Sequence, residues 1–245
     1  MTMIKSGLGL AGLVAVAALT AGSPAKAEEA RELTYSANLG ATSDYIFRGI
    51  SLSGEDPVVF GGLDVGYGIL YAGLWATDLG DNLPGGEVDF YVGVKPVLGP
   101  VTFDFGVIYY SYTENNSDLD YFELKAGASA EIAPKLTATG IFYYQIENDT
   151  IPEVLTYEAT LAYALPQVFM FSPTLSGTVG YADDTDEFGA FTADGDSYTY
   201  WNAGISLAVE KLTFDLRYWD TDLDESEAIY SGESRFLFTA KVTLP

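Results

Sequence analysis

The chain has 245 residues, with 35 Asp and Glu against 11 Lys and Arg, a formal net charge of −24, and neither histidine nor cysteine. The lack of histidine excludes Ser-His-Asp and Cys-His catalysis, histidine-ligated zinc or iron, and an imidazole pH switch. The strong negative charge disfavours binding of DNA or RNA. Because 48% of the residues are hydrophobic, the fold must separate apolar from acidic side chains.

Residues 1–27 have the pattern of a bacterial export signal. Lys5 supplies the positive start, residues 7–22 are apolar, and Ala25-Lys26-Ala27 gives the small-x-small pattern of a signal-peptidase site. A transmembrane helix is the alternative, but the apolar stretch is short for a span of about 20 residues. We therefore expect cleavage after Ala27 and one mature domain, residues 28–245.

The mature part shows period-two alternation of apolar and polar residues rather than a helical period. Phe90 and Val92, for example, alternate with Asp89, Tyr91 and Gly93, which places the two classes on opposite faces of a strand. Most alternating stretches have the roughly 9–11 residues that a tilted strand needs to cross a bilayer. The pattern predicts twelve strands, at residues 33–47, 58–67, 69–78, 87–97, 101–112, 120–132, 136–147, 153–165, 173–182, 198–209, 212–221 and 234–244.

The connections alternate between tight turns and longer acidic loops. The tight turns fall at 67–68, 98–100, 133–135 and 210–211, and the apolar segment 166–172 takes the place of a further turn. The longer connections are 48–57, 79–86, 113–119, 148–152, 183–197 and 222–233. Short turns on one side and longer loops on the other are typical of an up-and-down outer-membrane β-barrel.

A soluble β-sandwich would also give alternation and regular turns. Aromatic residues near the strand ends favour the membrane barrel, because amphipathic rings form girdles at both membrane interfaces. These aromatic residues are Tyr35, Tyr45, Phe47, Tyr67, Tyr71, Trp75, Tyr109, Tyr110, Tyr112, Tyr143, Tyr144, Tyr198, Tyr200, Trp201, Tyr218 and Trp219.

Two segments resemble a known family. Ser43-Asp44-Tyr45-Ile46-Phe47-Arg48-Gly49-Ile50-Ser51 resembles the opening motif of the TorF-type porin family, also called Gcw_chp. Residues 87–93 resemble the second block of that family, and residues 109–112 and 121–123 resemble weaker later ones. The resemblance implies an outer-membrane β-barrel of a Gram-negative bacterium, and it says more about architecture than about the solute.

A membrane barrel points its apolar face to lipid and its polar face inward, so the alternation assigns side chains to the lumen. Arg48 would end the first strand on the same face as Asp44. It could constrict the pore mouth or, as we favour, pair with a carboxylate that holds a loop. The predicted pore-lining residues are Asp44, Arg48, Glu87, Asp89, Lys95, Asp104, Glu123, Lys125, Gln145, Glu158, Asp215, Arg217, Arg235 and Lys241.

Twelve strands lie between small barrels filled by side chains and wide aqueous channels. We expect a porin-like channel for passive diffusion of small solutes or ions. An acidic rim of carboxylates, at the end of the barrel with the longer loops, would give it a preference for cations. They are Asp78, Asp81, Glu114, Asp118, Asp149, Asp183, Asp184, Asp186, Glu187, Asp222, Asp224, Glu225 and Glu227.

Two other classes of function stay open. One is a non-conducting structural or surface-interaction barrel, whose acidic loops bind divalent ions or a partner. The other is an outer-membrane enzyme, which is disfavoured because no histidine and no convincing substitute for a catalytic triad is present. We expect no catalytic residue, cofactor or metal site. The expected partners are outer-membrane lipids, lipopolysaccharide and, during biogenesis, the barrel-assembly machinery.

Overall fold

The computed structural model describes residues 32–80, 85–114, 119–184, 197–223 and 231–245. The predicted signal peptide lies outside these residues, as do parts of four of the predicted loops. Among the described segments, none forms an apolar helix of membrane-spanning length.

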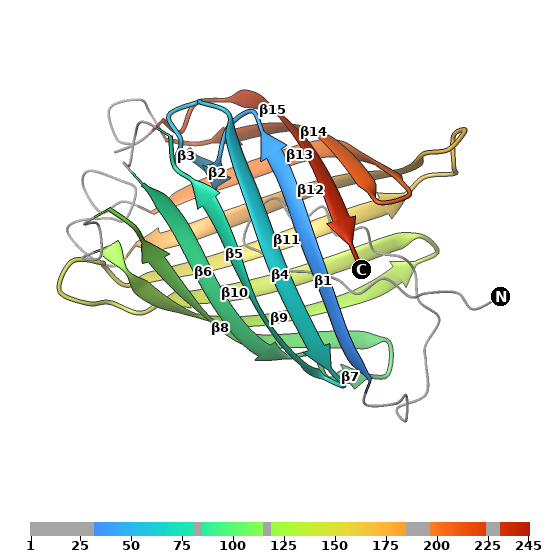
Figure 1. The fold of residues 1–245 in the computed structure, drawn as a ribbon, viewed down its shortest axis with the longest axis horizontal. Coiled ribbons are helices and arrows are strands. Elements are labelled where there is room, and N and C mark those ends of the chain that lie inside the picture. Colours follow the sequence, from blue (N-terminus) through green and yellow to red (C-terminus); the bar gives the residue numbers. More distant parts are fainter. Residues whose placement is uncertain (1–31, 81–84, 115–118, 185–196, 224–230) are drawn as a thin grey trace.

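Antiparallel strands form one closed sheet, ordered around the ring as they follow each other in the chain (Figure 1). The described residues contain a 13-stranded sheet, in which the two-residue β7 (Val97–Leu98) pairs with β8, and the other twelve strands make the barrel. The ring closes between β1 and β15, and β6 pairs with β8. The barrel strands are β1 (Leu33–Thr42), β4 (Val58–Tyr67), β5 (Leu70–Asp78), β6 (Gly86–Val94), β8 (Val101–Tyr112), β9 (Tyr121–Ala133), β10 (Leu136–Gln145), β11 (Val154–Ala164), β12 (Ser172–Asp184), β13 (Tyr198–Val209), β14 (Leu212–Thr221) and β15 (Arg235–Leu244).

This architecture confirms the predicted up-and-down barrel of twelve strands. The alternation located the strands well because each strand turns one face outward and the other face to the lumen, so a period of two recurs in every strand. Four predicted strands coincide with observed ones, namely 58–67, 101–112, 198–209 and 212–221.

The predicted first strand, 33–47, is wrong beyond Thr42. There the chain leaves the wall and forms a small hairpin of β2 (Ile46–Phe47) and β3 (Ile50–Ser51). Its turn residues, Arg48 and Gly49, have φ angles of 50° and 88°. Two central residues with positive φ are characteristic of the type I′ turn, which favours glycine at the second position. The strand-forming residues Tyr45 to Phe47 continue the β pattern, so composition alone did not mark the bend.

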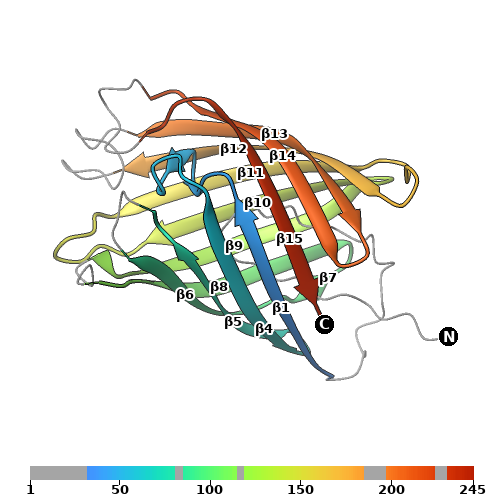
Figure 2. The same cartoon turned by 45° about the horizontal axis from the view of Figure 1, so that its top comes forward.

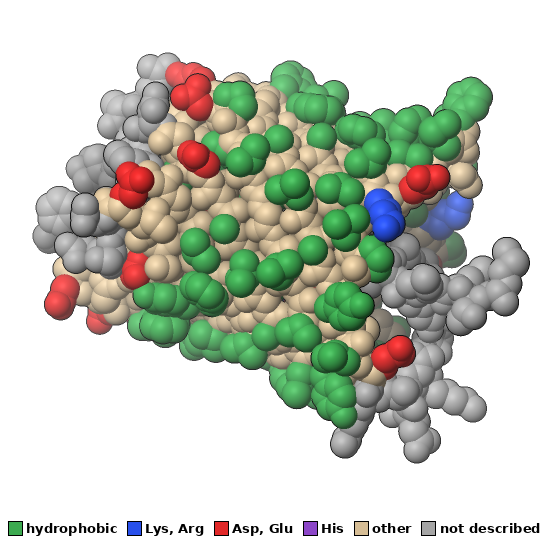
Figure 3. Space-filling view, in the orientation of Figure 1, with side chains coloured by type: hydrophobic (Ala, Val, Ile, Leu, Met, Phe, Trp, Pro, Cys, Tyr) green, Lys and Arg blue, Asp and Glu red, His purple; other side chains and the backbone are tan. Residues whose placement is uncertain are grey.

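The strands present apolar side chains outward and polar side chains inward. Phe90 and Phe238 are 49% and 50% exposed on the outer face, whereas Glu87 and Glu123 face inward and are 1% and 0% exposed. The space-filling view shows hydrophobic side chains over the middle of the visible wall, with most acidic ones at the end that carries the longer loops (Figure 3). An apolar outer band of this kind is the surface that lipid contact requires.

The predicted aromatic girdles are correct only in part. Neighbouring residues of a strand point to opposite faces, so each cluster of aromatic residues is divided between the outer face and the lumen. On the outer face lie Tyr35, Tyr67, Tyr109, Tyr144, Trp201 and Tyr218. Inside the barrel lie Tyr45, Phe47, Tyr71, Trp75, Tyr110, Tyr112, Tyr143, Tyr198, Tyr200 and Trp219.

Inward-facing glycines make room for two of the internal tyrosines. A Cβ at Gly180 would overlap the ring of Tyr200, and a Cβ at Gly93 would overlap the ring of Tyr71. Both rings therefore lie against the wall where any larger residue would displace them. Tyr200 lies toward the end with the longer loops and Tyr71 toward the end with the short turns, so aromatic rings occupy the interior near both ends.

Candidate functional site

The β2–β3 hairpin folds into the lumen at the end that carries the longer loops (Figure 2). Every residue from 44 to 53 is buried. Arg48 at its tip contacts Glu123 on β9, while the Tyr198 hydroxyl on β13 donates a hydrogen bond of 3.1 Å to the Arg48 carbonyl. Because β9 and β13 are four strands apart in the ring, the hairpin reaches across the lumen.

Asp44 fixes the base of this hairpin. Its carboxylate accepts hydrogen bonds from Ser51 Oγ at 2.7 Å and Ser53 Oγ at 2.8 Å. Arg235 Nη1, on the last strand, donates a third at 2.9 Å and also lies 3.3 Å from Glu55 Oε1. A charge-assisted bond to a buried carboxylate is among the stronger polar contacts in proteins. The base of the hairpin is thus attached to the barrel wall.

Arg48 fixes the tip. Its Nη2 lies 2.5 Å from Glu123 Oε1, and the two side chains are 5% and 0% exposed. Its guanidinium also stands 4.6 Å from the Phe47 ring centroid and 4.9 Å from that of Tyr143. Burial opposes the charge, but Glu123 and nearby tyrosines together raise the pKa of Arg48 well above its ordinary value. Arg48 therefore pairs with a carboxylate that holds the hairpin, which is the alternative favoured from its sequence position, and its side chain lies inside the ring of strands.

Two further carboxylates lie on β6. Glu87 accepts a hydrogen bond from the Tyr45 hydroxyl of the hairpin. Asp89 is 1% exposed, and neither of its oxygens has a hydrogen-bond partner in the described part of the chain. Its strongest electrostatic neighbours are Glu87 and Glu123, which are also acidic. Negative charge is therefore concentrated on this side of the lumen.

A second charge cluster lies closer to the end with the short turns. Asp104 is its centre, because Lys125 Nζ lies 2.7 Å and Lys95 Nζ 3.9 Å from its Oδ2. The Tyr71 hydroxyl donates a 2.7 Å hydrogen bond to Asp104 Oδ1, and Lys95 Nζ stands 4.5 Å from the centre of the Tyr71 ring. These lysines are held on one wall by a shared carboxylate.

The other wall carries an arginine network. Arg217 Nε lies 3.1 Å from Asp215 Oδ1. Arg217 also donates hydrogen bonds to Asn202 Oδ1 at 2.6 Å and to Ser176 Oγ at 2.9 Å. Lys241 on β15 is oriented toward the same interior, where Asp215 is one of its electrostatic partners. Positive and negative groups are thus present on both sides of the lumen.

The remaining predicted residues are hydrogen-bonded on the inner wall. Glu158 accepts a 2.6 Å bond from the Tyr200 hydroxyl, and Gln145 Nε2 donates a 2.8 Å bond to the Pro152 carbonyl. All predicted site residues thus face the interior. Asp44 and Arg48 reach it from the hairpin instead of from the first strand, where the sequence had placed them.

One inward-facing carboxylate was missed. Asp64 on β4 accepts hydrogen bonds from the Tyr91 hydroxyl at 2.5 Å and from Ser36 Oγ at 3.4 Å. Its neighbours Leu63 and Val65 are 55% and 42% exposed on the outer face. The same alternation rule applied to the predicted strand 58–67 would have found it.

The sequence relationships agree with this architecture. A family model described as "Bacterial protein of unknown function (Gcw_chp)" matches residues 26–244. This chain belongs to the Gcw_chp family. No curated protein sequence matches it.

Solved barrel structures are similar in fold to the Gcw_chp chain. A NanC porin superimposes with a TM-score of 0.59 at 11% identity, over 86% of this chain and 100% of that one. A protein from a study of in-meso crystallization of membrane proteins gives a TM-score of 0.50 at 11% identity, over 86% and 83%. OpdL of Pseudomonas aeruginosa gives 0.48 at 15%, over 86% and 67%. Likeness at such identities establishes the barrel fold and nothing more specific.

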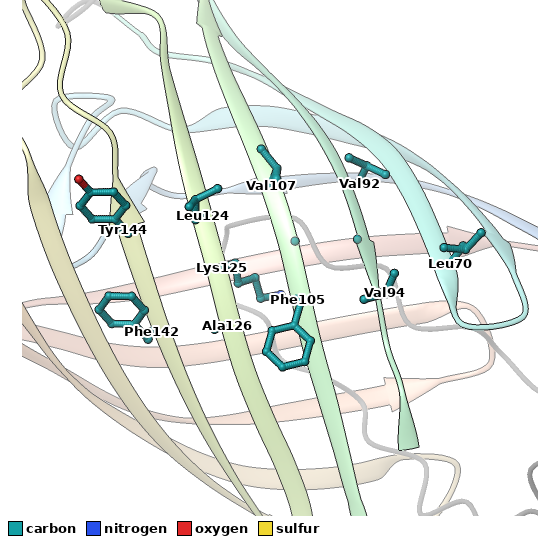
Figure 4. Close-up of a pocket in the computed structure, with 12 residues that line it drawn as sticks. Leu70, Val92, Val94, Phe105, Val107, Leu124, Lys125, Ala126, Phe142 and Tyr144 are labelled. Carbon is teal, nitrogen blue, oxygen red and sulfur yellow. The ribbon is translucent and has the colours of Figure 1, made fainter. Parts of the chain in front are cut away.

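The outer wall of the Gcw_chp barrel carries a shallow apolar concavity across β5, β6, β8, β9 and β10 (Figure 4). Its lining includes Val92, Phe105, Leu124 and Phe142, which point away from the lumen. Lys125 borders it only through the wall, since its ammonium group reaches Asp104 inside. The concavity is therefore part of the apolar outer surface, and the polar lumen is the candidate functional site.

Proposed function

We propose that this Gcw_chp protein is an outer-membrane, porin-like channel for passive diffusion of small solutes or ions. The observation that carries the proposal is the inner surface of charged and hydrogen-bonding side chains on all sides of the lumen. Burying such groups in a dry core costs free energy unless each is paired. A hydrated path along them accounts for the pattern, and the porin-type fold supports it.

The proposed path is lined by the fourteen predicted residues together with Asp64. The β2–β3 hairpin forms its narrowest part, since residues 44–53 are buried within the ring. Such a constriction favours small ions over bulky solutes. The barrel size agrees, because twelve strands enclose much less space than the 16–18 of wide porins.

Cation preference is the second part of the proposal. Asp64, Glu87, Asp89 and Glu158 face the lumen and form no ion pair with any basic residue that the structure describes. Of the basic residues in the lumen, only Lys241 has no ion pair within the described part of the chain. The surplus of carboxylates in the lumen favours cations along the path.

The acidic rim supports the same preference. Its described members are Asp78, Glu114, Asp149, Asp183 and Asp222, which lie at strand ends or in the connections at the end with longer loops. The other predicted rim residues, Asp81, Asp118, Asp186, Glu187, Asp224, Glu225 and Glu227, lie outside the described residues, and nothing is described of the Asp184 side chain.

The proposed location follows from the apolar outer band and the export-type leader. We propose that residues 1–27 direct export and are removed, and that the barrel-assembly machinery inserts residues 28–245 into the outer membrane of a Gram-negative bacterium. Outer-membrane lipids and lipopolysaccharide would contact the outer face. We propose no enzymatic activity.

Reconstitution of residues 28–245 in a planar lipid bilayer tests the channel. We expect discrete conductance steps, and under a tenfold KCl gradient a reversal potential with the sign for cation permeation. A double variant that carries Glu158→Gln and Asp64→Asn removes two of these carboxylates and should move the reversal potential toward zero. A reversal potential of the anion sign would refute the cation preference.

A silent bilayer would refute conduction itself. It would favour the competing function, a non-conducting structural barrel, for which the buried hairpin within the lumen is the specific observation. Refolding would be verified first by the far-ultraviolet circular dichroism of β-structure and by heat-modifiable migration on a denaturing gel, so that silence could not reflect unfolded protein.

A further inference from the structure

The turn between β11 and β12 presents large apolar side chains at its tip. Phe169 is 93% exposed and Met170 is 64% exposed, and the neighbouring Val168 is also exposed. This turn projects beyond its neighbours at the end with the short turns (Figure 1), and hydrophobic side chains reach its tip in the space-filling view (Figure 3). A contiguous apolar patch on a protruding turn marks a surface that an apolar partner covers.

The backbone of the turn holds Phe169 in a conformation that a bulky residue disfavours. Val168 and Phe171 exchange two backbone hydrogen bonds of 3.0 Å, so Phe169 and Met170 are the central residues of a tight hairpin turn. Phe169 has a φ angle of 53°. Positive φ at the first central residue is characteristic of the type II′ turn, where glycine is usual. An aromatic ring kept at such a position indicates a use for the ring.

The turn continues a part of the outer wall that lacks charge. Residues 159–182, which comprise the turn with most of β11 and β12, contain no Asp, Glu, Lys or Arg, in a chain with 35 acidic residues. Tyr163 and Leu175, an outward-facing pair near the turn, are both exposed. The turns at 133–135 and 210–211, by contrast, carry charged residues. The apolar outer band therefore runs along this hairpin to its tip.

Carbonyl groups of the tip backbone find donors within the turn. Phe171 N donates to the Val168 carbonyl, and Val168 N donates to the Phe171 carbonyl. Gln167 Nε2 donates a 3.1 Å hydrogen bond to the Phe169 carbonyl. Water can satisfy the carbonyls of an exposed turn, whereas the apolar part of a bilayer offers no donor. Internal bonds of this kind fit a tip that leaves water for lipid.

We propose that the tip, Val168 to Phe171, inserts into the phospholipid leaflet on the side of the short turns, with Phe169 and Met170 among the acyl chains. A protein-binding patch carries a polar rim around its apolar core, whereas the residues on both sides of this tip are uncharged. The insertion rests on the proposed membrane location. It does not depend on conduction, because the tip lies outside the lumen.

Spin labels on the full mature barrel measure the depth of the tip. The chain has no cysteine, so Phe169→Cys gives a single labelling position. Leu216→Cys on the outer wall and Lys211→Cys in a charged turn are the references, in vesicles of phosphatidylethanolamine and phosphatidylglycerol. We expect the label at 169 to collide with oxygen more than with a water-soluble nickel complex, as the label at 216 does. A label at 169 that behaves like the one at 211 would overturn the insertion.

The references distinguish failure of the insertion from failure of the membrane location. A label in lipid at 216 together with a label in water at 169 would refute the insertion and leave the barrel in the bilayer. Labels in water at both positions would refute the membrane location and the insertion with it. Conductance, present or absent, changes neither result.

Asparagine variants separate lipid contact from backbone strain. Asparagine adopts positive φ more readily than phenylalanine, so Phe169→Asn would stabilise a tip that lies in water. In vesicles we expect it instead to lower the urea midpoint by roughly 0.5 M, because the ring loses its apolar surroundings. The matched control is Glu210→Asn, since Glu210 is exposed in a turn at the same end and has a φ angle of 52°. The control midpoint should stay the same or rise.

The conservative variant Phe169→Leu completes the test. It keeps an apolar side chain on the same backbone and should retain most of the wild-type midpoint in vesicles. A loss as large as that of Phe169→Asn would assign the effect to the ring itself and refute lipid contact. An unchanged or higher midpoint for Phe169→Asn, or equal losses in Phe169→Asn and Glu210→Asn, would also overturn the proposal.

Discussion

Arg235 Nη1 lies 2.9 Å from Asp44 Oδ2, joining residues that are 191 positions apart in the chain. The last strand thereby holds the base of the hairpin that follows the first strand. Because β15 also pairs with β1 to close the ring, this bond joins the hairpin to the strand that completes the barrel. Seating of the hairpin in the lumen is consequently coupled to closure of the barrel.

Removal of this bond should loosen the hairpin while leaving the barrel closed. We expect Arg235→Ala to lower the free energy of unfolding by about 2 kcal/mol, the value of a hydrogen bond to a charged group. Urea unfolding measures the loss. Lys211→Ala, in an exposed turn, is the control and should leave the unfolding free energy unchanged. Equal stability of both variants would show that Arg235 does not anchor the hairpin.

The ion pair at the hairpin tip should show strong coupling. Arg48→Ala leaves Glu123 buried without its partner, and we expect a loss of about 3 kcal/mol because an unpaired buried charge is costly. Replacing both residues with alanine removes that charge as well. The double variant should therefore be more stable than Arg48→Ala alone. A double-mutant cycle in urea measures the coupling, and strictly additive losses would contradict the predicted pairing.

Shortening the hairpin should widen the path. Replacement of residues 44–56 by a short Gly-Ser linker removes the segment that lies across the lumen, and we expect single-channel conductance to rise severalfold. The control replaces the turn residues Val168, Phe169 and Met170 with glycine and serine, at the opposite end of the barrel and outside the lumen. Conductance that is unchanged or reduced in the hairpin variant would contradict the role of the hairpin as the constriction.

The sequence predicted the wall far better than the contents of the lumen. Leu216 and Arg217 fall on opposite faces because adjacent strand residues always do, so a period of two assigns both correctly. The hairpin escaped prediction because Tyr45, Ile46 and Phe47 are as suitable for a lipid-facing strand as for a packed interior. Only the Arg48-Gly49 pair, which can form a tight turn, carried a local signal. The partner of Arg48 on β9 is 75 residues away, and no local pattern specifies such a contact.

The fit between Gly180 and Tyr200 should be sensitive to a single methyl group. A Cβ at Gly180 overlaps the Tyr200 ring, whose hydroxyl donates a 2.6 Å hydrogen bond to Glu158. We expect Gly180→Ala to cost about 1–3 kcal/mol of unfolding free energy, since the ring must move. Gly140→Ala is the control, because its nearest atom would be 4.0 Å away. Urea unfolding should show a larger loss of unfolding free energy for Gly180→Ala than for Gly140→Ala. Equal losses would contradict the close packing.

The orientation of the barrel in lipid can be tested on its outer face. Leu216 is 50% exposed near the middle of β14, where the barrel orientation predicts contact with the bilayer centre. We expect Leu216→Arg to lower the unfolding free energy in lipid vesicles by about 2–4 kcal/mol, the cost of a basic residue at the midplane. Leu98→Arg, at the 73% exposed β7 turn, should cost less than about 1 kcal/mol, because charge near the interface remains hydrated. Equal losses at the two positions, or a larger loss at Leu98, would mean that the apolar band of β14 does not lie at the bilayer centre.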